Sequence, residues 1–205
     1  MAIISNGTTI ADAGAFSASL GALTLIKTLT LSNAATASFV HGASSVVFDS
    51  TYPIYRFEFI NMHPVTNSAE FDFNGRDGST AYDAIKTTTA FSTFNHETSS
   101  ETAAINYNAD VDVAQETGFQ TLTYDVGSDN DQHTSGTLTI YNPSSTTFVK
   151  HFMSTSVNYH SGDYAQEFFI GGYFNVTAAI DAIQFKFSTG NIDSGIIKLY
   201  GIKDS

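Results

Sequence analysis

Alternation of apolar and polar residues recurs along the chain and predicts a series of β-strands. In the segment YRFEFI, the apolar Tyr55, Phe57 and Phe59 alternate with Arg56 and Glu58. Side chains two residues apart lie on the same face of a strand, so this pattern is typical of a strand with one buried face. We therefore expect the three aromatic rings to point into a core.

A longer run of the same kind lies nearer the start of the sequence. In ALTLIKTLTL, the period of two predicts that Leu23, Leu25, Leu29 and Leu31 share one face. The segments TASFV and SVVFD follow, separated by His41-Gly42, and each is expected to form a strand.

Turn residues divide the next strand signals. AEFDFNGRDG ends on Asn74-Gly75 and Asp77-Gly78, two dipeptides that favour tight turns. From Gly136 onward the strand pattern resumes in GTLTIY, TFVKHFMSTSVNY, QEFFIGGYFNV, AIQFKFS and GIIKLYGIK, and the intervening NPSST favours a hairpin. Gly171-Gly172 inside an apolar strand indicates a bulge or a close approach of another backbone.

Residues 82–130 have a weaker pattern. Within AQETGFQTLTYDV and the residue before it, Val113, Phe119, Leu122 and Val126 have a loosely helical spacing. We expect one short helix in this part of the chain.

The fold class predicted from these signals is an all-β, antiparallel β-sandwich of jelly-roll type, because eight to eleven short strands leave little room for crossover helices. We expect residues 21–205 to form a single soluble domain. Residues 1–20 are small and polar, with Ile3, Ile4, Ile10 and Phe16 as isolated apolar anchors. This segment is predicted to be an extended N-terminal arm that binds a partner through those four residues.

Composition changes the picture mainly by exclusion. The 205 residues include 8 basic and 20 acidic side chains, a formal net charge of −12, which repels phosphate backbones and argues against nucleic-acid binding. There is no cysteine, so disulfides and thiolate metal sites are excluded. No apolar run is long enough for a membrane span, and the first residues lack the pattern of a signal peptide. We expect the protein to be synthesised in a cytoplasm. We do not expect it to insert into a membrane.

The six histidines are candidates for metal binding or acid–base chemistry, but none occurs in HExxH or in a short HxH pair. They are interpreted as surface or core residues, and pH sensing is the role expected if one is functional. They are His41, His63, His96, His133, His151 and His160.

Two acidic segments place oxygen ligands close together, as calcium loops do. One contains Asp110 and Asp112, and the other contains Asp125, Asp129 and Asp131. Neither matches the EF-hand register, so a solvated loop and a calcium site both remain open for each.

No motif for nucleophilic catalysis or phosphate binding is present, since GxSxG, GxGxxG and the P-loop are all missing. Glu58 and Glu167 lie in predicted strands and are an example of a carboxylate pair of the kind that glycoside hydrolysis requires. We therefore expect that the protein is not an enzyme, and that it has no catalytic residues, no cofactor and no metal. The abundance of Phe and Tyr leaves a ring-lined sugar-binding groove as an alternative.

Three stretches together resemble a family of structural proteins of tailed phages, common in marine and cyanobacterial viruses. They are LTLIKTLTLSNAATASFVHGASSVVFDSTYPIYRFEFINMHP, SGTLTIYNPSSTTFVKHF and FKFSTGNIDSGIIKLYGIK, and the resemblance runs from about residue 22 to residue 203.

The resemblance implies a non-enzymatic virion component, either a capsid decoration (cement) protein or a head or tail fibre module. Its expected partners are other virion proteins and further copies of itself, with a trimer favoured. The alternative is a lectin-like receptor-recognition module of a phage fibre that binds a host surface glycan. The expected location is the virion, after synthesis in the host cytoplasm.

Overall fold

The computed structural model describes residues 3–5, 8–12, 15–16, 22–98 and 103–203. These residues form strands and connecting loops, and no helix occurs among them. The strands are β1 (Ile3–Ser5), β2 (Thr8–Asp12), β3 (Ala15–Phe16), β4 (Leu23–Ala34), β5 (Ala37–Val40), β6 (Ile54–Pro64), β7 (Ala69–Arg76), β8 (Lys86–His96), β9 (Ala104–Tyr107), β10 (Ala114–Glu116), β11 (Gln120–Val126), β12 (Thr134–Tyr141), β13 (Lys150–His160), β14 (Tyr164–Phe174), β15 (Ala182–Phe187) and β16 (Ile192–Ile202).

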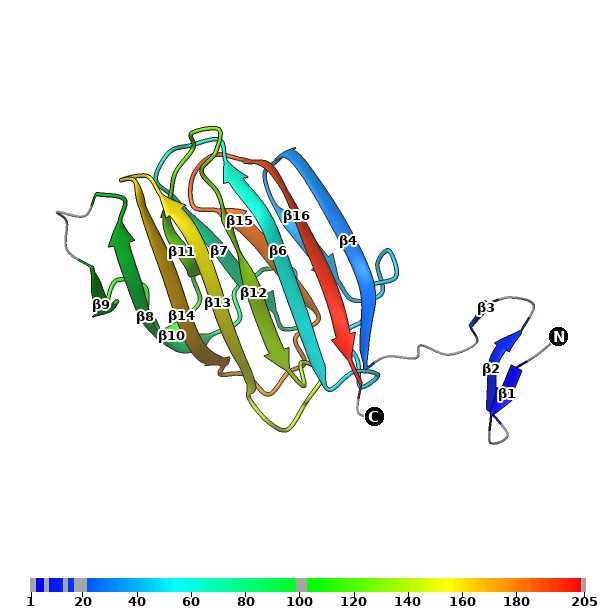
Figure 1. Cartoon of the computed structure of the whole chain (residues 1–205). Helices are drawn as coiled ribbons and strands as arrows, with labels where there is room; N and C mark the ends of the chain where they lie inside the picture. Colours follow the sequence, from blue (N-terminus) through cyan, green and yellow to red (C-terminus); the bar gives the residue numbers. More distant parts are fainter. Residues whose placement is uncertain (1–2, 6–7, 13–14, 17–21, 99–102, 204–205) are drawn as a thin grey trace.

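The strands β4 to β16 form one large antiparallel sheet that folds over itself and is nearly barrel-shaped. Its front layer has the order β4-β16-β6-β12-β13-β14-β8, with β9 and β10 paired to β8 (Figure 1). Its back layer has the order β11-β7-β15-β5, and a single residue pair, Val126 with His160, joins β11 to β13. The prediction of an all-β, antiparallel fold is therefore confirmed.

Aromatic rings fill the space between the two layers. Phe57 of β6 contacts Phe185 of β15, and Phe73 of β7 contacts Phe152 of β13, with ring centroids 5.2 and 5.1 Å apart. Edge-to-face pairs of this kind add to the burial of apolar area. The predicted inward face of β6 is confirmed, because Tyr55, Phe57 and Phe59 are all buried.

The predicted common face of four leucines in β4 is wrong. The register of β4 against β16 shifts where Leu199 pairs with Lys27 and Tyr200 pairs with Leu25, so Ile26 is an extra residue. An extra residue reverses the alternation of faces. As a result Leu23 and Leu25 are exposed, whereas Leu29 and Leu31 pack against the core.

The segment SVVFD is also not a strand. Its Val46 and Phe48 are buried, but backbone bonds of a compact loop hold them: Gly42 N–H donates to Val46 O, and Val46 N–H donates to Ala43 O. The ring of His41 accepts a hydrogen bond from Phe48 N–H at 2.9 Å. Burial of apolar residues therefore does not require a strand here.

The short helix expected within residues 82–130 is wrong for the described residues of that range. Ala114–Glu116 and Gln120–Val126 are strands β10 and β11. Residues of β11 pair with β7 and bury Gln120 and Leu122, two residues apart. Sheet pairing overrides the weak helical spacing.

Two glycine predictions have different outcomes. Asn74-Gly75 lies inside β7 rather than in a turn, because both residues pair with β15. Gly172 is a close-approach site, since a Cβ there would lie 2.7 Å from the carbonyl oxygen of Thr87. The alternative of a bulge is wrong, because β14 keeps its register with both neighbours through Gly171 and Gly172.

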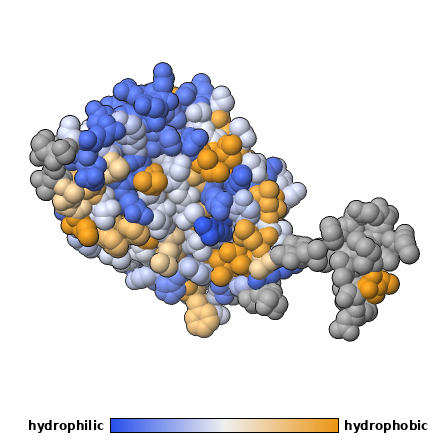
Figure 2. Space-filling view, viewed as in Figure 1, coloured by the Kyte–Doolittle hydropathy of each residue, from blue (hydrophilic) through white to orange (hydrophobic). Residues whose placement is uncertain are grey.

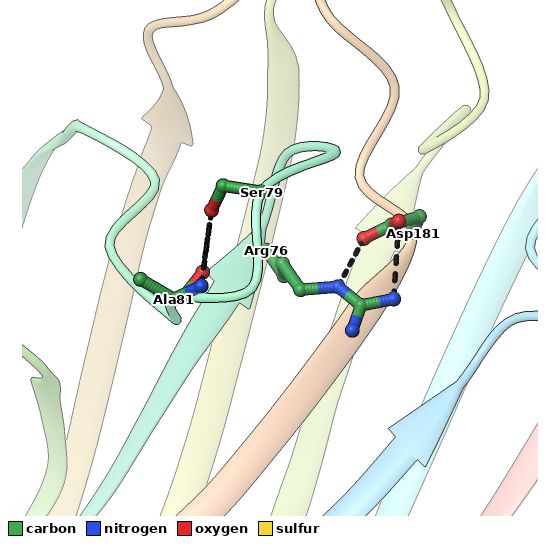
Figure 3. A network of polar contacts seen from close by, with 4 residues as sticks. All are labelled: Arg76, Ser79, Ala81 and Asp181. Atoms are coloured by element: carbon green, nitrogen blue, oxygen red, sulfur yellow. Dashed lines mark hydrogen bonds and ion pairs between the residues drawn. The ribbon is translucent and has the colours of Figure 1, made fainter.

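A two-point ion pair fastens the end of β7 to the start of β15. Arg76 donates from Nε to Asp181 Oδ1 at 2.8 Å and from Nη2 to Oδ2 at 3.1 Å (Figure 3). Asp181 N–H also donates to the carbonyl of Arg76 at 2.9 Å. The turn after β7 is closed by Ser79, whose hydroxyl bonds to the backbone of Ala81.

The outer face of the front layer mixes polar and apolar side chains. Figure 2 shows apolar patches scattered over a largely hydrophilic surface. The exposed apolar side chains on this face include Phe91, Met153 and Val157. The rings of Phe91 and Phe169 stack with centroids 4.7 Å apart.

The predicted arm contains three short strands that pair with one another in the order β1-β2-β3. Ile3 and Ile4 lie in β1, Ile10 in β2 and Phe16 in β3. Ile4 is exposed. Residues 1–2, 6–7, 13–14 and 17–20 of this segment lie outside the described residues, and the predicted role of the four anchors stays a prediction.

Candidate binding cleft

A cleft of about 520 Å³ opens at the edge of the core, between the two layers. One wall is the inner face of β8, β13 and β14, and the other consists of β11 and the loop that follows β9. Fourteen residues line it: Ser92, Phe94, Asn106, Tyr107, Asn108, Ala109, Asp110, Val111, Tyr124, Asp125, His160, Tyr164, Gln166 and Phe168. Rings and polar side chains thus alternate in a concave site, which is the usual composition of a small-ligand site.

Three rings form a row across the strands at one end of the cleft. His96, Tyr164 and His160 occupy opposite positions on β8, β14 and β13. The ring of Tyr164 lies between the other two, with centroid distances of 4.5 Å to His96 and 3.9 Å to His160. Strand pairing fixes this row, so the ring of Tyr164 is positioned before any ligand arrives.

Both ring nitrogens of His160 have partners. Nδ1 accepts a hydrogen bond from Gly162 N–H at 2.9 Å, so the proton of the neutral ring is on Nε2, which lies 3.4 Å from Asp125 Oδ2. Burial lowers the pKa of His160, and the negative charge of Asp125 opposes that shift. The neutral ring has no free nitrogen to act as a general base, so the arrangement suits a structural role better than catalysis.

The loop that follows β9 is fastened to the sheet. Asn108 N–H donates to Ala90 O at 3.0 Å, and Asn108 Nδ2 donates to Ser92 Oγ at 2.9 Å. Buried Gln120 donates from Nε2 to Val111 O at 2.8 Å. These bonds hold the cleft wall in place, and a preformed wall reduces the entropy cost of binding.

Gln166 is the polar side chain with an unmet hydrogen-bonding need in this cleft. It is 8% exposed, and its Oε1 is buried without a hydrogen-bond partner among the residues that the structure describes. A buried carbonyl oxygen without a partner costs free energy, about 1 to 3 kcal/mol. A ligand that donates a hydrogen bond to this oxygen would recover that cost.

The charge of the cleft is negative. Asp110 and Asp125 line it together with His160, which is held neutral, and no Lys or Arg occurs among the fourteen lining residues. The pKa of Tyr124 is raised above its ordinary value, first by the charge of Asp125 and also by burial, Glu70 and Asp110. The carboxylates therefore act on the same phenol.

The proposed carboxylate pair is not brought together. Glu58 lies on β6 and Glu167 on β14, with β12 and β13 between them. Three strand spacings separate their backbones by about 14 Å, whereas glycosidase carboxylates lie about 5 to 9.5 Å apart. Glu58 instead pairs with Arg56 at 3.7 Å.

None of the other histidines lines the cleft. His151 lies on the exposed face of β13, opposite in direction to buried His160, so these two do not share a site. His63 contacts Asp193 Oδ2 at 3.2 Å and the carbonyl of Asp129 at 3.1 Å. His133 contacts the carbonyl of Asp131 at 3.3 Å.

Neither acidic segment forms a group of metal-ligating side chains in the part of the chain that the structure describes. The carboxylate of Asp112 accepts a hydrogen bond from the Tyr107 hydroxyl. Asp125 points to His160, and the backbone N–H of Asp129 binds Gln132 Oε1. Calcium binding by these segments stays untested.

Sequence reasoning singled out Asp110, Asp125 and His160, and the structure brings all three to one cleft. It missed Tyr124, Tyr164 and Gln166, because their local patterns resemble those of any half-buried strand. The fact that Gln166 lies between Phe94 and Asn158 across three strands depends on long-range pairing, which no local pattern reveals.

Comparison of the chain with protein-family models, curated proteins and solved structures gives no match. The resemblance to tailed-phage structural proteins therefore stays a prediction. In the described residues no helix is long and apolar enough to cross a bilayer.

Proposed function

We propose that this protein is a non-enzymatic binding module and that the cleft holds a carbohydrate. The observation that carries the proposal is that Tyr124, Phe94 and Gln166 line one preformed concave site, and that Gln166 Oε1 has no hydrogen-bond partner among the described residues. Ring faces accept the apolar C–H faces of sugars, and amides and carboxylates bond their hydroxyls.

The bonding of His160 supports a binding role over a catalytic one, since both its nitrogens are engaged. The separation of Glu58 and Glu167 supports it too. A cleft of about 520 Å³ has the size of a site for a small ligand.

The test is a glycan array with the full chain, followed by titration of the best ligand. Tyr124→Ala removes an exposed ring of the cleft and is expected to weaken binding at least about tenfold. Tyr141→Ala is the matched control, because Tyr141 is equally exposed, at 37%, and does not line the cleft. If no glycan binds reproducibly, or if both variants weaken binding equally, the proposal fails.

The second candidate is a structural subunit of a tailed-phage virion, a capsid decoration protein or fibre module located in the particle. It is favoured by the three stretches that resemble such proteins and by the exposed apolar side chains on the front layer, among them Phe91 and Met153. Its partners would be other virion proteins and further copies of the chain, with a trimer favoured. The two functions are compatible, because a subunit of a particle can also bind a glycan.

We further propose that the two layers form a sandwich of jelly-roll type and that residues 1–20 are an arm that joins the body to its assembly. The chain crosses between layers repeatedly, from β4 to β5, back to β6, on to β7 and back to β8, which supports the first point. The separate β1-β2-β3 pairing supports the second.

Removal of residues 1–20 tests the arm. The truncated chain should be absent from virions that assemble in its presence. A chain with Ile4→Ser, a change at an exposed anchor, should be incorporated less well than the wild type. Normal incorporation of the truncated chain would contradict this role.

A further inference from the structure

We infer that the cleft selects a basic amino sugar, binding it through a protonated amino group, in preference to neutral or acidic sugars. This inference rests on the carbohydrate-binding function proposed above. It adds the charge of the ligand, which the rings alone do not determine.

The first step is the electrostatic balance of the site. Two carboxylates, Asp110 and Asp125, line the cleft, and its described lining residues include no Lys or Arg. The chain as a whole carries a formal charge of −12. An acidic sugar would be repelled, and an ammonium group would be attracted both at long range and in the site.

The second step concerns the protonation of His160, the remaining titratable base in the cleft. Its Nδ1 is occupied by the Gly162 N–H, so a proton there would face another donor at 2.9 Å. The imidazole therefore does not supply a positive charge to offset the two carboxylates.

The third step concerns the rings. Tyr124 and Phe94 line the cleft, whereas the ring of Tyr164 stacks between His160 and His96, so Tyr124 and Phe94 are the rings that a ligand can contact. The face of an aromatic ring carries negative potential and attracts a cation within about 6 Å of its centroid. Rings and carboxylates thus favour the same ligand charge.

The fourth step is the buried acceptor. Gln166 is more than nine-tenths buried and lines the cleft, and its Oε1 has no hydrogen-bond partner within the described part of the chain. A carbonyl oxygen accepts only from a donor, and an ammonium group offers three N–H donors where a hydroxyl offers one. A charged donor also makes a stronger hydrogen bond to a carbonyl than a neutral one.

The experiment is calorimetric titration of the full chain with two matched probes in buffer containing EDTA. One is a short oligosaccharide of glucosamine with free amines, and the other is the same oligosaccharide with every amine acetylated. At a pH just below neutral, which stays above the lowered pKa of His160, the free-amine form is expected to bind at least about tenfold more tightly. Added salt should reduce this preference, because a partly exposed ion pair is screened.

Asp110→Asn and Asp125→Asn are each expected to reduce the affinity for the free-amine form several-fold and to leave the acetylated form nearly unchanged. Asn is tolerated at position 125, where φ is +49°. Asp83→Asn makes the same charge change at an exposed site outside the cleft and should have no effect. Gln166→Met removes the buried acceptor at similar volume and should weaken the amine form more than the acetylated one.

Several results would overturn the inference. Equal or tighter binding of the acetylated probe, with Tyr124→Ala still abolishing it, would leave a carbohydrate site but reject the amine preference. Binding of spermidine or choline as tight as that of the amino sugar would reject a sugar ligand and leave only a general ammonium site. Binding that occurs only when calcium replaces EDTA would assign the carboxylates to a metal. Absence of binding by every probe would reject this inference, and the glycan array decides separately on the proposed function.

Discussion

Asp72 is a buried carboxyl whose charge the fold does not neutralise well. It is 5% exposed, and its Oδ1 lacks a hydrogen-bond partner in the described part of the chain. Burial raises its pKa to about 7, and the negative charge of Glu70 adds to the shift. In the unfolded chain the same group titrates near 3.8. At pH values between these two pKa values, the carboxyl of Asp72 is therefore protonated in the folded state and ionised in the unfolded state.

The sign of the pH dependence follows from this difference. Between about pH 4 and pH 7 the folded state binds more protons at Asp72, so stability falls as pH rises through this range. Asp72→Asn keeps the shape and removes the titration, and at about pH 8 it should raise the free energy of unfolding by up to about 4 kcal/mol. Near pH 4 the variant and the wild type should be equally stable.

Urea unfolding at several pH values measures this effect, with Asp83→Asn as a control because Asp83 is exposed. The control should show no comparable gain. A difference between Asp72→Asn and the wild type that does not grow with pH would contradict the assignment.

His160 has the opposite pH dependence. Burial lowers its pKa below the ordinary 6.5, so below that pH the unfolded state binds more protons and stability falls as pH decreases through the folded pKa. NMR of the imidazole nitrogens should show a neutral ring protonated on Nε2 that titrates below 6.5. A ring protonated on Nδ1 at neutral pH would be inconsistent with the bond from Gly162 N–H.

At the residue scale, sequence alone predicted what depends on composition and period. It indicated that Tyr55, Phe57 and Phe59 are buried, and the structure confirms it. It could not predict that Lys150, in an apparent alternating strand, is fully buried. Its Nζ donates to carbonyls of two loops, including Val176 O at 2.7 Å and Ala178 O at 2.5 Å. That environment is assembled from distant segments.

At the scale of elements, the ion pair between Arg76 and Asp181 joins β7 to the residue that precedes β15. Its side chains are 20% and 32% exposed, and both carboxylate oxygens are engaged. Lys cannot reproduce this two-point geometry. Arg76→Lys is therefore expected to reduce the free energy of unfolding by about 1 kcal/mol.

The matched control is Arg56→Lys on β6. Arg56 contacts Glu58 at a single distance of 3.7 Å, and its side chain is 42% exposed. A looser, exposed pair contributes little, so this change should stay within about 0.5 kcal/mol. Equal losses in the two variants would show that the bidentate geometry contributes nothing extra.

The sequence predicted strands correctly where one face of the segment is apolar. The predictions failed where pairing with a distant strand determines the conformation. The segments from Gly136 onward follow a clear period and are strands β12 to β16. In contrast, Val113, Phe119, Leu122 and Val126 suggested a helix, but the edge of β7 determines the conformation of β11. The extra residue at Ile26 of β4 is likewise visible only in its register with β16. A local pattern contains no information on its partner strand.

At the scale of the whole molecule, the described strand pairs divide into two sets. β1, β2 and β3 pair with one another, and β4 to β16 form the large sheet with its ring-filled core. Stability of the body should then depend on the second set, because the buried core residues all lie between Ala37 and Leu199 among the side chains that the structure describes.

A chain that begins at Ala22 should therefore fold, and its urea midpoint should match that of the full chain. The two free energies of unfolding should agree within about 0.5 kcal/mol. The m-value should change little, because it scales with the surface exposed on unfolding and the core is unchanged. Circular dichroism and urea titration of both chains make the comparison. A clear loss of stability would mean that residues 1–21 pack on the body, and the role of this segment as an arm for partners would have to be abandoned in favour of a structural one.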